Sequence, residues 1–309
     1  MKLEEARWLR SALPQGRTLY RYYKDRYSLQ LLRYAVPAET PVQALRASSV
    51  AGLLQKPRVR DVLARCDGRL SPSLLQQADG DPSDECYVLS LGLWRGQQMS
   101  RDGCNLVLQL NFARSHDVPF RHLVRPEDGV DPFNYYAHPV LEDERRERRY
   151  TLAWSRIDVD LDAGEALIEE VQSDWVRQAV AMQRYAARFP EGAMLQRFGV
   201  NADAERMQRY GETLLARHAA VWDEAMLSAT LFFLREELGI RHIYYHTQAS
   251  GQCLKRIHHR LPPRSLYTEL PRRFCFRETD ALPGFLARMR RIARLRKVHA
   301  DLRMHVLQV

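Results

Sequence analysis

The chain has 309 residues, of which 45% are hydrophobic and 28% are charged, and its formal net charge is +9. Such a composition is typical of a soluble globular protein with one large domain or two ordinary ones. The five cysteines are scattered and form no CxxC pair, which argues against a disulfide framework or a cysteine-rich zinc site and favours a reducing cytosol.

No targeting or membrane segment is expected. The first ten residues, MKLEEARWLR, contain acids where a signal peptide needs an apolar run. The longest apolar stretch, at 225–234, is interrupted by Ser228 and Thr230 and is too short to cross a bilayer. We therefore expect a cytoplasmic protein.

Residues 1–80 are predicted to form a helical N-terminal region. Across 1–35, large apolar side chains recur at spacings of three or four, as on one face of a helix. They are Tyr20, Tyr23, Tyr27, Leu31 and Tyr34. This face either stacks bases between the interleaved Arg and Lys side chains or packs on the core, and we favour packing because helical spacing alone explains the tyrosines. Short helices are expected at 42–54 and 59–66, and the polar loop 76–85 marks a boundary.

Residues 81–280 are predicted to form a sheet domain. Strands are expected at 86–94 and 104–112, and alternation gives the second strand one fully apolar face. Segment 113–149 is predicted to be long and irregular. The stretches 150–161 and 165–172 form the clearest hairpin, with Asp162-Ala163-Gly164 as the turn.

The remaining elements complete an α+β fold. Helices are predicted at 175–188, 203–219 and 222–238, and Gly239 ends the last of these. The strand expected at 240–246 returns parallel to the 165–172 strand, with a helix covering the pair. A polar turn at 247–251, a short helix at 254–258, a last strand at 272–276 and a basic helix at 285–302 follow. The predicted fold is therefore a mixed, mainly antiparallel sheet with one βαβ crossover, a helical N-terminal extension and a basic C-terminal segment, 281–309.

The most informative segment is 165–177, EALIEEVQSDWVR, where a strand ends in a polar cluster. Strict alternation places Glu170 and Gln172 on one face and Glu169 on the other. Burying an unpaired charge costs several kcal/mol, so these carboxylates need a sheet rim or dedicated partners. A strand that ends in this way and runs into a helix is where α/β folds usually place ligands.

A candidate catalytic site follows from the expected parallel pairing. The strand ends would bring Glu170, Gln172, Ser173 and Asp174 together with His246, Thr247 and Ser250. A carboxylate and an imidazole at one rim can share general acid–base work. We take Glu170 or Asp174 as base or orienter and His246 as acid–base. The alternative is a polar network that pins the strand to the following helix, with Asp174 as its N-cap.

The candidate substrate-binding residues lie in two segments. Gln172, Ser173 and Thr247 belong to the strand ends, and Arg264 and Tyr267 lie in PPRSLYTELPRRF. The second segment gives a rigid corner followed by cations and one aromatic, either a clamp on an anionic or planar substrate or a surface loop with solvated arginines. No metal site is predicted and no cofactor is assigned, because neither H-E-x-x-H nor a glycine-rich phosphate motif occurs.

The positive charge is concentrated near the C-terminus. Residues 283–309 hold seven Lys and Arg side chains against a single acid, Asp301. The candidate polyanion-binding residues are Arg288, Arg291, Arg294 and Lys297. Apolar side chains also recur here at helical spacing, so one face packs and the other is free for nucleic acid, an acidic protein or an anionic surface.

Two resemblances bear on these segments. The string LIEEVQSDW, from Leu167 to Trp175, resembles a signature, [LF]-I-E-E-[IV]-Q-S-D-W, of an uncharacterised family of bacterial and phage-encoded proteins. It implies membership across roughly 150–277 but no particular reaction. The order of strands and helices is also similar to the GNAT acyltransferase fold, although 172–178 lacks the glycine-containing pyrophosphate loop of that fold.

Two functions remain open from the sequence. The first is an enzyme that performs group transfer or hydrolysis on a small anionic or nucleotide-like substrate. The second is a non-catalytic protein whose basic helices bind nucleic acid or an acidic partner.

Overall fold

The computed structural model describes residues 1–11, 18–135, 138, 149–190, 195–257, 261–299 and 302–308. In this part of the chain an eight-stranded mixed sheet is packed with helices, so the predicted α+β class is confirmed. The described residues include no helix long and apolar enough to cross a membrane.

The main sheet has the strand order β1-β4-β5-β6-β7-β8-β10-β9. Its strands are β1 (Thr18–Tyr22), β4 (Glu85–Trp94), β5 (Asn105–Phe112), β6 (Thr151–Asp160), β7 (Glu165–Gln172), β8 (His242–His246), β9 (Arg277–Thr279) and β10 (Met304–Gln308). Neighbouring strands are antiparallel except β7 and β8, which are parallel. The predicted parallel crossover is thus confirmed. Strands β2 (Thr40–Pro41) and β3 (Arg69–Leu70) pair with each other separately.

The helices fall into three groups along the chain. The first contains α1 (Leu3–Arg10), α2 (Arg26–Ala35), α3 (Val42–Arg46), the 3₁₀ turn η1 (Ala51–Gln55), α4 (Pro57–Leu63) and α5 (Pro72–Gln77). The second contains α6 (Arg114–Val124), α7 (Asp174–Arg188), η2 (Gln196–Phe198), α8 (Ala204–Tyr210), the π turn η3 (Gly211–Leu215), α9 (Ala216–Ala219), α10 (Trp222–Phe232) and the π turn η4 (Phe233–Glu237). The third contains α11 (Gln248–Leu254), the π turn η5 (Ser265–Glu269), α12 (Leu270–Arg273), α13 (Gly284–Ala287) and α14 (Arg290–Val298).

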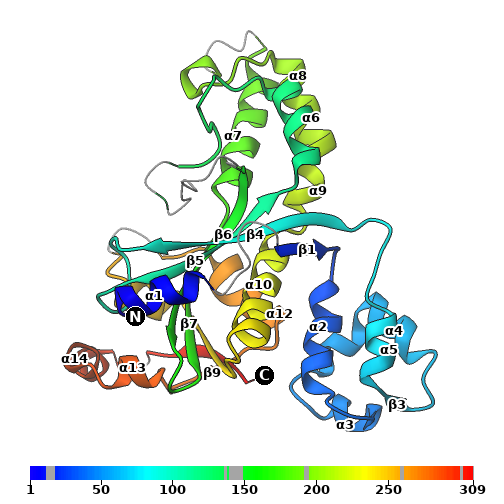
Figure 1. The fold of residues 1–309 in the computed structure, drawn as a ribbon, viewed down its shortest axis with the longest axis vertical. Coiled ribbons are helices and arrows are strands. Elements are labelled where there is room, and N and C mark those ends of the chain that lie inside the picture. Colours follow the sequence, from blue (N-terminus) through cyan, green and yellow to red (C-terminus); the bar gives the residue numbers. More distant parts are fainter. Residues whose placement is uncertain are drawn as a thin grey trace.

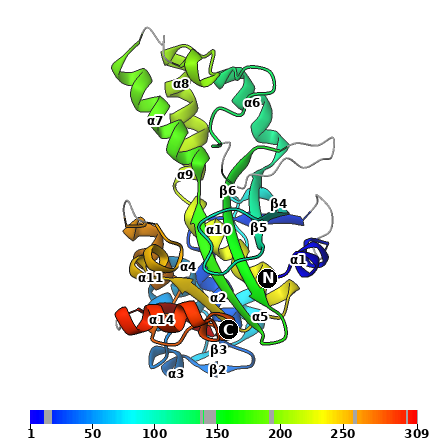
Figure 2. The same cartoon turned by 90° about the vertical axis from the view of Figure 1, so that its left-hand side faces the viewer.

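These groups occupy different places around the sheet. Helices α6, α7, α8 and α9 project from one end, and α2, α3, α4 and α5 gather near the other end (Figure 1). The perpendicular view shows the same separation (Figure 2). Helix α10 packs on β5, β6 and β7, whereas α11, α13 and α14 pack on the opposite face of β7 and β8.

The β6–β7 hairpin forms where the sequence predicts it. Its turn is closed by a hydrogen bond from the Ala163 amide to Asp160 Oδ1 (3.1 Å), and Gly164 adopts φ +64°, a conformation that costs glycine little. The strands expected at 86–94 and 104–112 and the helices at 175–188, 203–219 and 222–238 are also confirmed within a few residues, the last two being continued by π turns.

The prediction that residues 1–35 are helical is wrong at 18–22. Thr18–Tyr22 is instead an edge strand paired with β4, and helix α2 starts at Arg26. Tyr20 and Tyr22 fit the two-residue period of a strand, which the helical pattern concealed. The tyrosines nevertheless pack on the core, since Tyr20, Tyr23 and Tyr27 are all at most 5% exposed, and they offer no open platform for bases.

Five further predictions of local structure are wrong. Segment 113–149, expected to be irregular, contains helix α6, in which Pro119 removes a hydrogen-bond donor without ending the helix. Residues 248–251 begin helix α11 instead of forming a turn, and α11 ends at Leu254, where the next helix was expected to begin. Position 258, the end of that expected helix, lies outside the described residues.

The C-terminal elements are also shifted. Arg272 and Arg273 end helix α12, and the strand expected at 272–276 follows later, as β9. The basic segment is divided into α13 and α14, and β10 follows it between β8 and β9.

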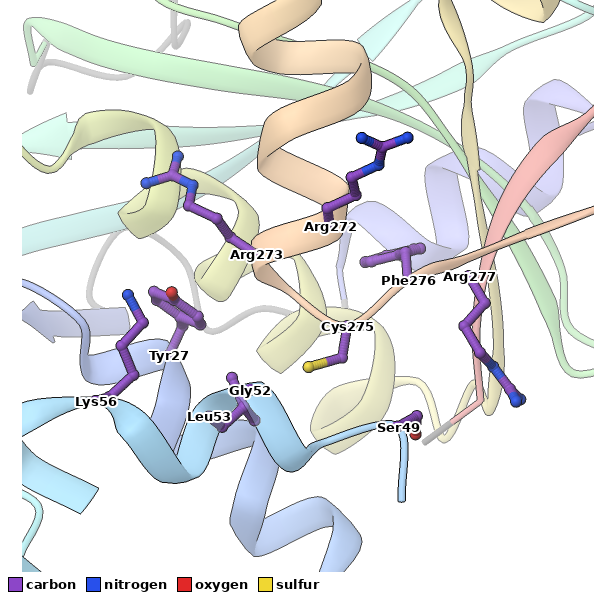
Figure 3. Close-up of a pocket in the computed structure, with 10 residues that line it drawn as sticks. All are labelled: Tyr27, Ser49, Gly52, Leu53, Lys56, Arg272, Arg273, Cys275, Phe276 and Arg277. Carbon is purple, nitrogen blue, oxygen red and sulfur yellow. The ribbon is translucent and has the colours of Figure 1, made fainter. Parts of the chain in front are cut away.

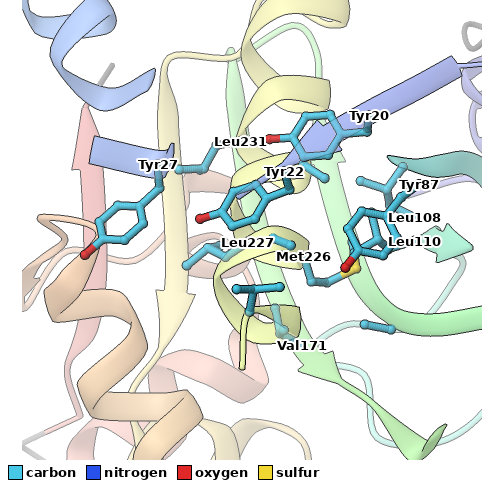
Figure 4. Packing of buried hydrophobic residues seen from close by; sticks show 14 of the residues in the cluster. Tyr20, Tyr22, Tyr27, Tyr87, Leu108, Leu110, Val171, Met226, Leu227 and Leu231 are labelled. Atoms are coloured by element: carbon cyan, nitrogen blue, oxygen red, sulfur yellow. The ribbon is translucent and has the colours of Figure 1, made fainter. Parts of the chain in front are cut away.

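The main hydrophobic core lies between α10 and one face of the sheet. It includes Leu108 and Leu110 of β5, Val171 of β7, and Met226 and Leu227 of α10. Figure 4 shows these side chains with the tyrosines of β1, β4 and α2 around them. The opposite face of the sheet is different, and it positions the candidate site.

Candidate functional site

The face of the sheet away from α10 carries charged and polar side chains, and we call it the polar face. Strand alternation brings Trp154 and Arg156 of β6 to this face, while the neighbouring Ser155 points to α10 and bonds Thr230 (2.8 Å). On β8, His246 shares this face with Tyr244, which packs in a small apolar cluster with α11, α13 and α14.

A β-bulge in β7 changes the expected distribution of the carboxylates. Arg156 pairs with Glu170 but the next residue of β6, Ile157, pairs with Ile168, so Glu169 is the extra residue of the bulge. Ile168 and Val171, three positions apart, consequently both join the main core. The prediction that Glu169 and Glu170 point to opposite faces is therefore wrong, because both carboxylates contact groups on the polar face.

The first cluster on this face is a buried ion network formed by Arg156, Glu169, Glu170, His246 and Lys255. Glu170 Oε2 accepts hydrogen bonds from Arg156 Nη2 (2.5 Å) and from Lys255 Nζ (2.9 Å). The Glu169 carboxylate accepts two bonds from Ser100, through the amide and the hydroxyl (2.9 Å each), and lies 3.1 Å from His246 Nε2. Glu169 and His246 are completely buried, and Lys255 is 1% exposed.

The charges of this network cancel. Burial raises the pKa of Glu170, but the positive charges of Lys255 and Arg156 outweigh it and lower the pKa to about 2. Burial, reinforced by the same two cations, lowers the pKa of His246 despite its bond to Glu169. The imidazole is then neutral at neutral pH, its Nε2 hydrogen donated to Glu169 and its Nδ1 accepting from the Ser250 hydroxyl (3.1 Å). Two cations therefore balance two carboxylates.

The network also fills the place where β7 and β8 part. Their pairing ends at Ile168 and Tyr245, and the carbonyl of the bulge residue Glu169 is left without a partner on β8. Lys255 Nζ (3.1 Å) and the Tyr267 hydroxyl (3.4 Å) both donate to this carbonyl. A buried carbonyl needs such donors, so these side chains take over the role of the missing strand.

The second cluster lies beside the first, at the end of β7, and we call it the rim cluster. It consists of His138, Trp154, Gln172, Asp174 and Arg177. Asp174 Oδ2 accepts from His138 Nδ1 (2.7 Å) and Trp154 Nε1 (3.3 Å), and Oδ1 accepts from Gln172 Nε2 (2.8 Å) and Arg177 Nη2. Because four donors saturate the carboxylate, it orients its neighbours.

The His138 side chain is the accessible member of a carboxylate–histidine pair. Asp174 is completely buried, whereas the His138 side chain is 28% exposed. With the Nδ1 hydrogen directed at Asp174, Nε2 carries a lone pair, and it forms no hydrogen bond with any other residue that the structure describes. The rings of Tyr135 and Trp154 flank the imidazole edge-on, at 4.9 and 5.6 Å between centroids. This arrangement can accept a proton from a bound group.

The candidate catalytic residues, and the candidate binding residue Gln172, are therefore divided between two clusters. Asp174 and Gln172 belong to the rim cluster, whereas Glu170 and His246 lie in the buried ion network, where they contact protein groups. The predicted meeting of His246 with Asp174 does not occur, because β7 extends four residues beyond its last pairing with β8, about 13 Å along the strand.

The other predicted binding residues are also dispersed. Ser173, rather than Asp174, caps α7: its hydroxyl accepts from the Val176 amide (3.0 Å) and donates to the Leu152 carbonyl. Thr247 caps α11 in the same way. Tyr267 is buried against Lys255 (3.1 Å), and Arg264 is a surface residue 3.6 Å from Glu269.

The predicted polyanion-binding residues differ in how free they are. Arg291 donates to the carbonyls of Ser100 and Leu254, and Arg288 lies 3.2 Å from Asp160. Arg294 and Lys297 are exposed and form no ion pair with other described residues.

Sequence reasoning missed Arg156, Lys255 and His138, which are central to the two clusters. The hairpin turn places Arg156 opposite Glu169 and Glu170, so the ion pair between Arg156 and Glu170 could have been predicted from the sequence. Lys255 comes from a segment without a local signal, and the motif gives no hint of the contact between His138 and Asp174, 36 positions apart. The described residues contain no group of three His, Cys, Asp or Glu side chains placed to hold a metal ion.

Comparison of the chain with protein-family models, with curated proteins and with solved structures finds no match. The structure itself shows an α+β chain with a buried ion network and an accessible carboxylate–histidine pair on one sheet face.

Proposed function

We propose that the chain is an enzyme that carries out hydrolysis or group transfer by general base catalysis, with His138 as the base and Asp174 as its orienter. The hydrogen bond between the buried Asp174 carboxylate and the accessible His138 imidazole carries this proposal. A carboxylate that accepts from Nδ1 fixes the tautomer and stabilises the imidazolium formed when Nε2 takes a proton from water or a hydroxyl.

An anionic substrate fits the charges around the pair. The Arg177 side chain is 51% exposed beside Asp174, and its guanidinium retains donors that can bind a carboxylate or phosphate. The Gln172 amide holds Asp174 in place and contributes to the same rim. A small anionic or nucleotide-like substrate can thus be positioned by Arg177 with its reacting atom near His138.

Acyl-CoA is not the substrate that this rim favours. The N-terminus of α7 is capped by Ser173, and Asp174 adds a carboxylate in its first turn. A pyrophosphate at that place would meet a negative charge and find the amide donor of Val176 already bound to Ser173. We therefore propose water or a hydroxyl as the acceptor of the transferred group.

Reactivity of the histidines tests the site without a known substrate. Diethyl pyrocarbonate modifies accessible neutral imidazoles, and mass spectrometry locates the products. We expect His138 to react faster than the exposed His122 of α6, Asp174→Asn to slow it, and the buried His246 to stay unmodified. Equal rates at His138 and His122, unaffected by Asp174→Asn, would contradict the proposal.

A turnover assay then tests the catalysis. Using a panel of nitrophenyl esters of carboxylic and phosphoric acids, we expect His138→Gln and Asp174→Asn to lower the rate by about 10²–10⁴-fold. The matched variant His122→Gln should retain full activity. Retained turnover in His138→Gln would exclude His138 as the base.

A polyanion-binding function is the second candidate, and the free cations of α14 support it. Arg294 and Lys297 project from a helix whose Ile292 is fully buried, so their face is fixed toward solvent. A salt titration separates the two functions: polyanion binding through this face loses affinity steeply with salt and is unaffected by His138→Gln.

A further inference from the structure

A cavity of about 330 Å³ lies between the N-terminal helices and the α12–β9 segment, away from the rim cluster. It is lined by Tyr27, Ser49, Gly52, Leu53, Lys56, Arg272, Arg273, Cys275, Phe276 and Arg277. In Figure 3, Tyr27 and Lys56 form one end and Phe276 and Arg277 the other, with Cys275 and Leu53 between them. Its volume is in the range of small-ligand sites.

The charged side chains that line this cavity are all cations. Lys56 is held by Asp25 (2.7 Å), and Arg273 by Asp223 and Glu224, but none of these carboxylates lines the cavity. Such pairs fix the direction of the cations while leaving some of their donors unused. Arg272 is likewise paired with Glu278 (3.4 Å), which does not line the cavity, and Arg277, at the far end from Lys56, forms no ion pair with other described residues.

A buried hydroxyl at the cavity lacks an acceptor for its hydrogen. Tyr27 is completely buried, its ring stacks on Phe274 (4.3 Å between centroids), and its hydroxyl donates to no described group. Leaving a buried hydroxyl unsatisfied is unfavourable, so a group that accepts its hydrogen is the missing component. Lys56 Nζ lies 5.4 Å from the centroid of the same ring.

The cysteine of the cavity acts as a wall and not as a nucleophile. Burial raises the pKa of the Cys275 thiol to about 11, so the thiol stays protonated at neutral pH. With Leu53 and Phe276 it gives the cavity an apolar side opposite the cations, which suits a ligand with one charged and one apolar end.

We propose that this cavity binds a small phosphomonoester. Lys56 and Arg273, which lie on the same side of the cavity as Tyr27 in Figure 3, donate to the phosphoryl oxygens. The Tyr27 hydroxyl donates to one of them, and the organic part packs against Leu53 and Phe276. Several separate donors suit the three terminal oxygens of a phosphomonoester better than the two of a carboxylate. The site does not depend on the reaction proposed for the rim cluster.

Calorimetric titration of the full chain with phenyl phosphate tests the proposal, with phenol as the uncharged counterpart. We expect one site for phenyl phosphate, weaker binding of inorganic phosphate, and none for phenol. Arg273→Gln should weaken the binding about tenfold or more, as loss of a charged hydrogen bond does. The matched variant Arg197→Gln removes an exposed arginine from η2, far from the cavity, and should bind as the wild type does. Absence of binding, or equal weakening by both variants, overturns the proposal.

Tyr27→Phe distinguishes a hydroxyl that binds ligand from one that only contributes to stability. Because the hydroxyl donates to no described group without ligand, its removal should leave the melting temperature of the free protein unchanged or higher while weakening phenyl phosphate about three- to tenfold. Lower stability with unchanged affinity would contradict the site. A last measurement distinguishes a small molecule from nucleic acid. If an oligonucleotide without terminal phosphates binds more tightly than phenyl phosphate, and Arg273→Gln abolishes that binding, the cavity binds a phosphodiester chain instead.

Discussion

Replacing Lys255 with methionine should strongly destabilise the protein. The Lys255 ammonium donates to Glu170 Oε2, to the Glu169 carbonyl and to the Tyr267 hydroxyl, at 2.9 to 3.1 Å. Methionine keeps most of the volume but removes all three hydrogen bonds and leaves the network with one excess negative charge. Breaking a buried pair in this way costs about 3–5 kcal/mol.

Chemical unfolding followed by tryptophan fluorescence measures this loss. For a chain of 309 residues each kcal/mol shifts the melting temperature by roughly 1.5 °C, so a decrease of about 5–8 °C is also expected. The matched control, Lys297→Met, makes the same chemical change on an exposed helix face and should alter stability by less than about 0.5 kcal/mol.

A double variant makes the reasoning refutable. Lys255→Met with Glu170→Gln restores the balance of one cation, Arg156, and one carboxylate, Glu169. We expect it to be more stable than the sum of the two single losses predicts, by about 1–3 kcal/mol. Strict additivity, or a loss below about 0.5 kcal/mol in Lys255→Met alone, would show that charge balance does not hold this network together.

The same variant has a defined pH dependence. The cations lower the pKa of Glu170 from 4.5 to about 2, so its ionised form adds stability above pH 4.5, and this stability is lost as the pH falls toward 2. The difference between wild type and Lys255→Met should therefore be largest at neutral pH and shrink between pH 4.5 and 2.

Two further substitutions test packing and burial elsewhere. Alanine normally stabilises a helix relative to glycine, but a Cβ at Gly251 would lie 2.8 Å from the Tyr267 ring. Gly251→Ala should therefore lower the free energy of unfolding in urea by about 1–3 kcal/mol. A gain in stability would show that the ring moves freely. Burial lowers the pKa of His116 to about 3, so between pH 6.5 and 3 the imidazole binds a proton only in the unfolded state. This residue alone should therefore lower the free energy of unfolding by about 2 kcal/mol at pH 5 relative to pH 7.5. His116→Phe, which retains stacking on Phe112, should remove one proton from the measured slope, and an unchanged slope would mean that His116 titrates normally when folded.

The sequence alone determined the local architecture wherever the spacing of apolar side chains matched either a strand or a helix but not both. Alternating leucines defined β5, the Asp162–Gly164 turn defined the β6–β7 hairpin, and the long apolar helix ending near Gly239 indicated the parallel return of β8. These signals are local, because they depend on side chains a few positions apart. Where two periods overlapped, as at Tyr20 and Tyr22, the wrong one was chosen.

Only the tertiary structure decided which charged side chains meet. The bulge at Glu169 turns the carboxylates of Glu169 and Glu170 toward one face, and Lys255, 86 positions away, donates to the buried carbonyl of Glu169. Asp174 is satisfied in the same way by His138. The partners of a buried charge lie close in space, and the residues next to it do not specify where along the chain those partners are. For this reason the strand at 165–172 could be predicted from the sequence, whereas its contacts could not.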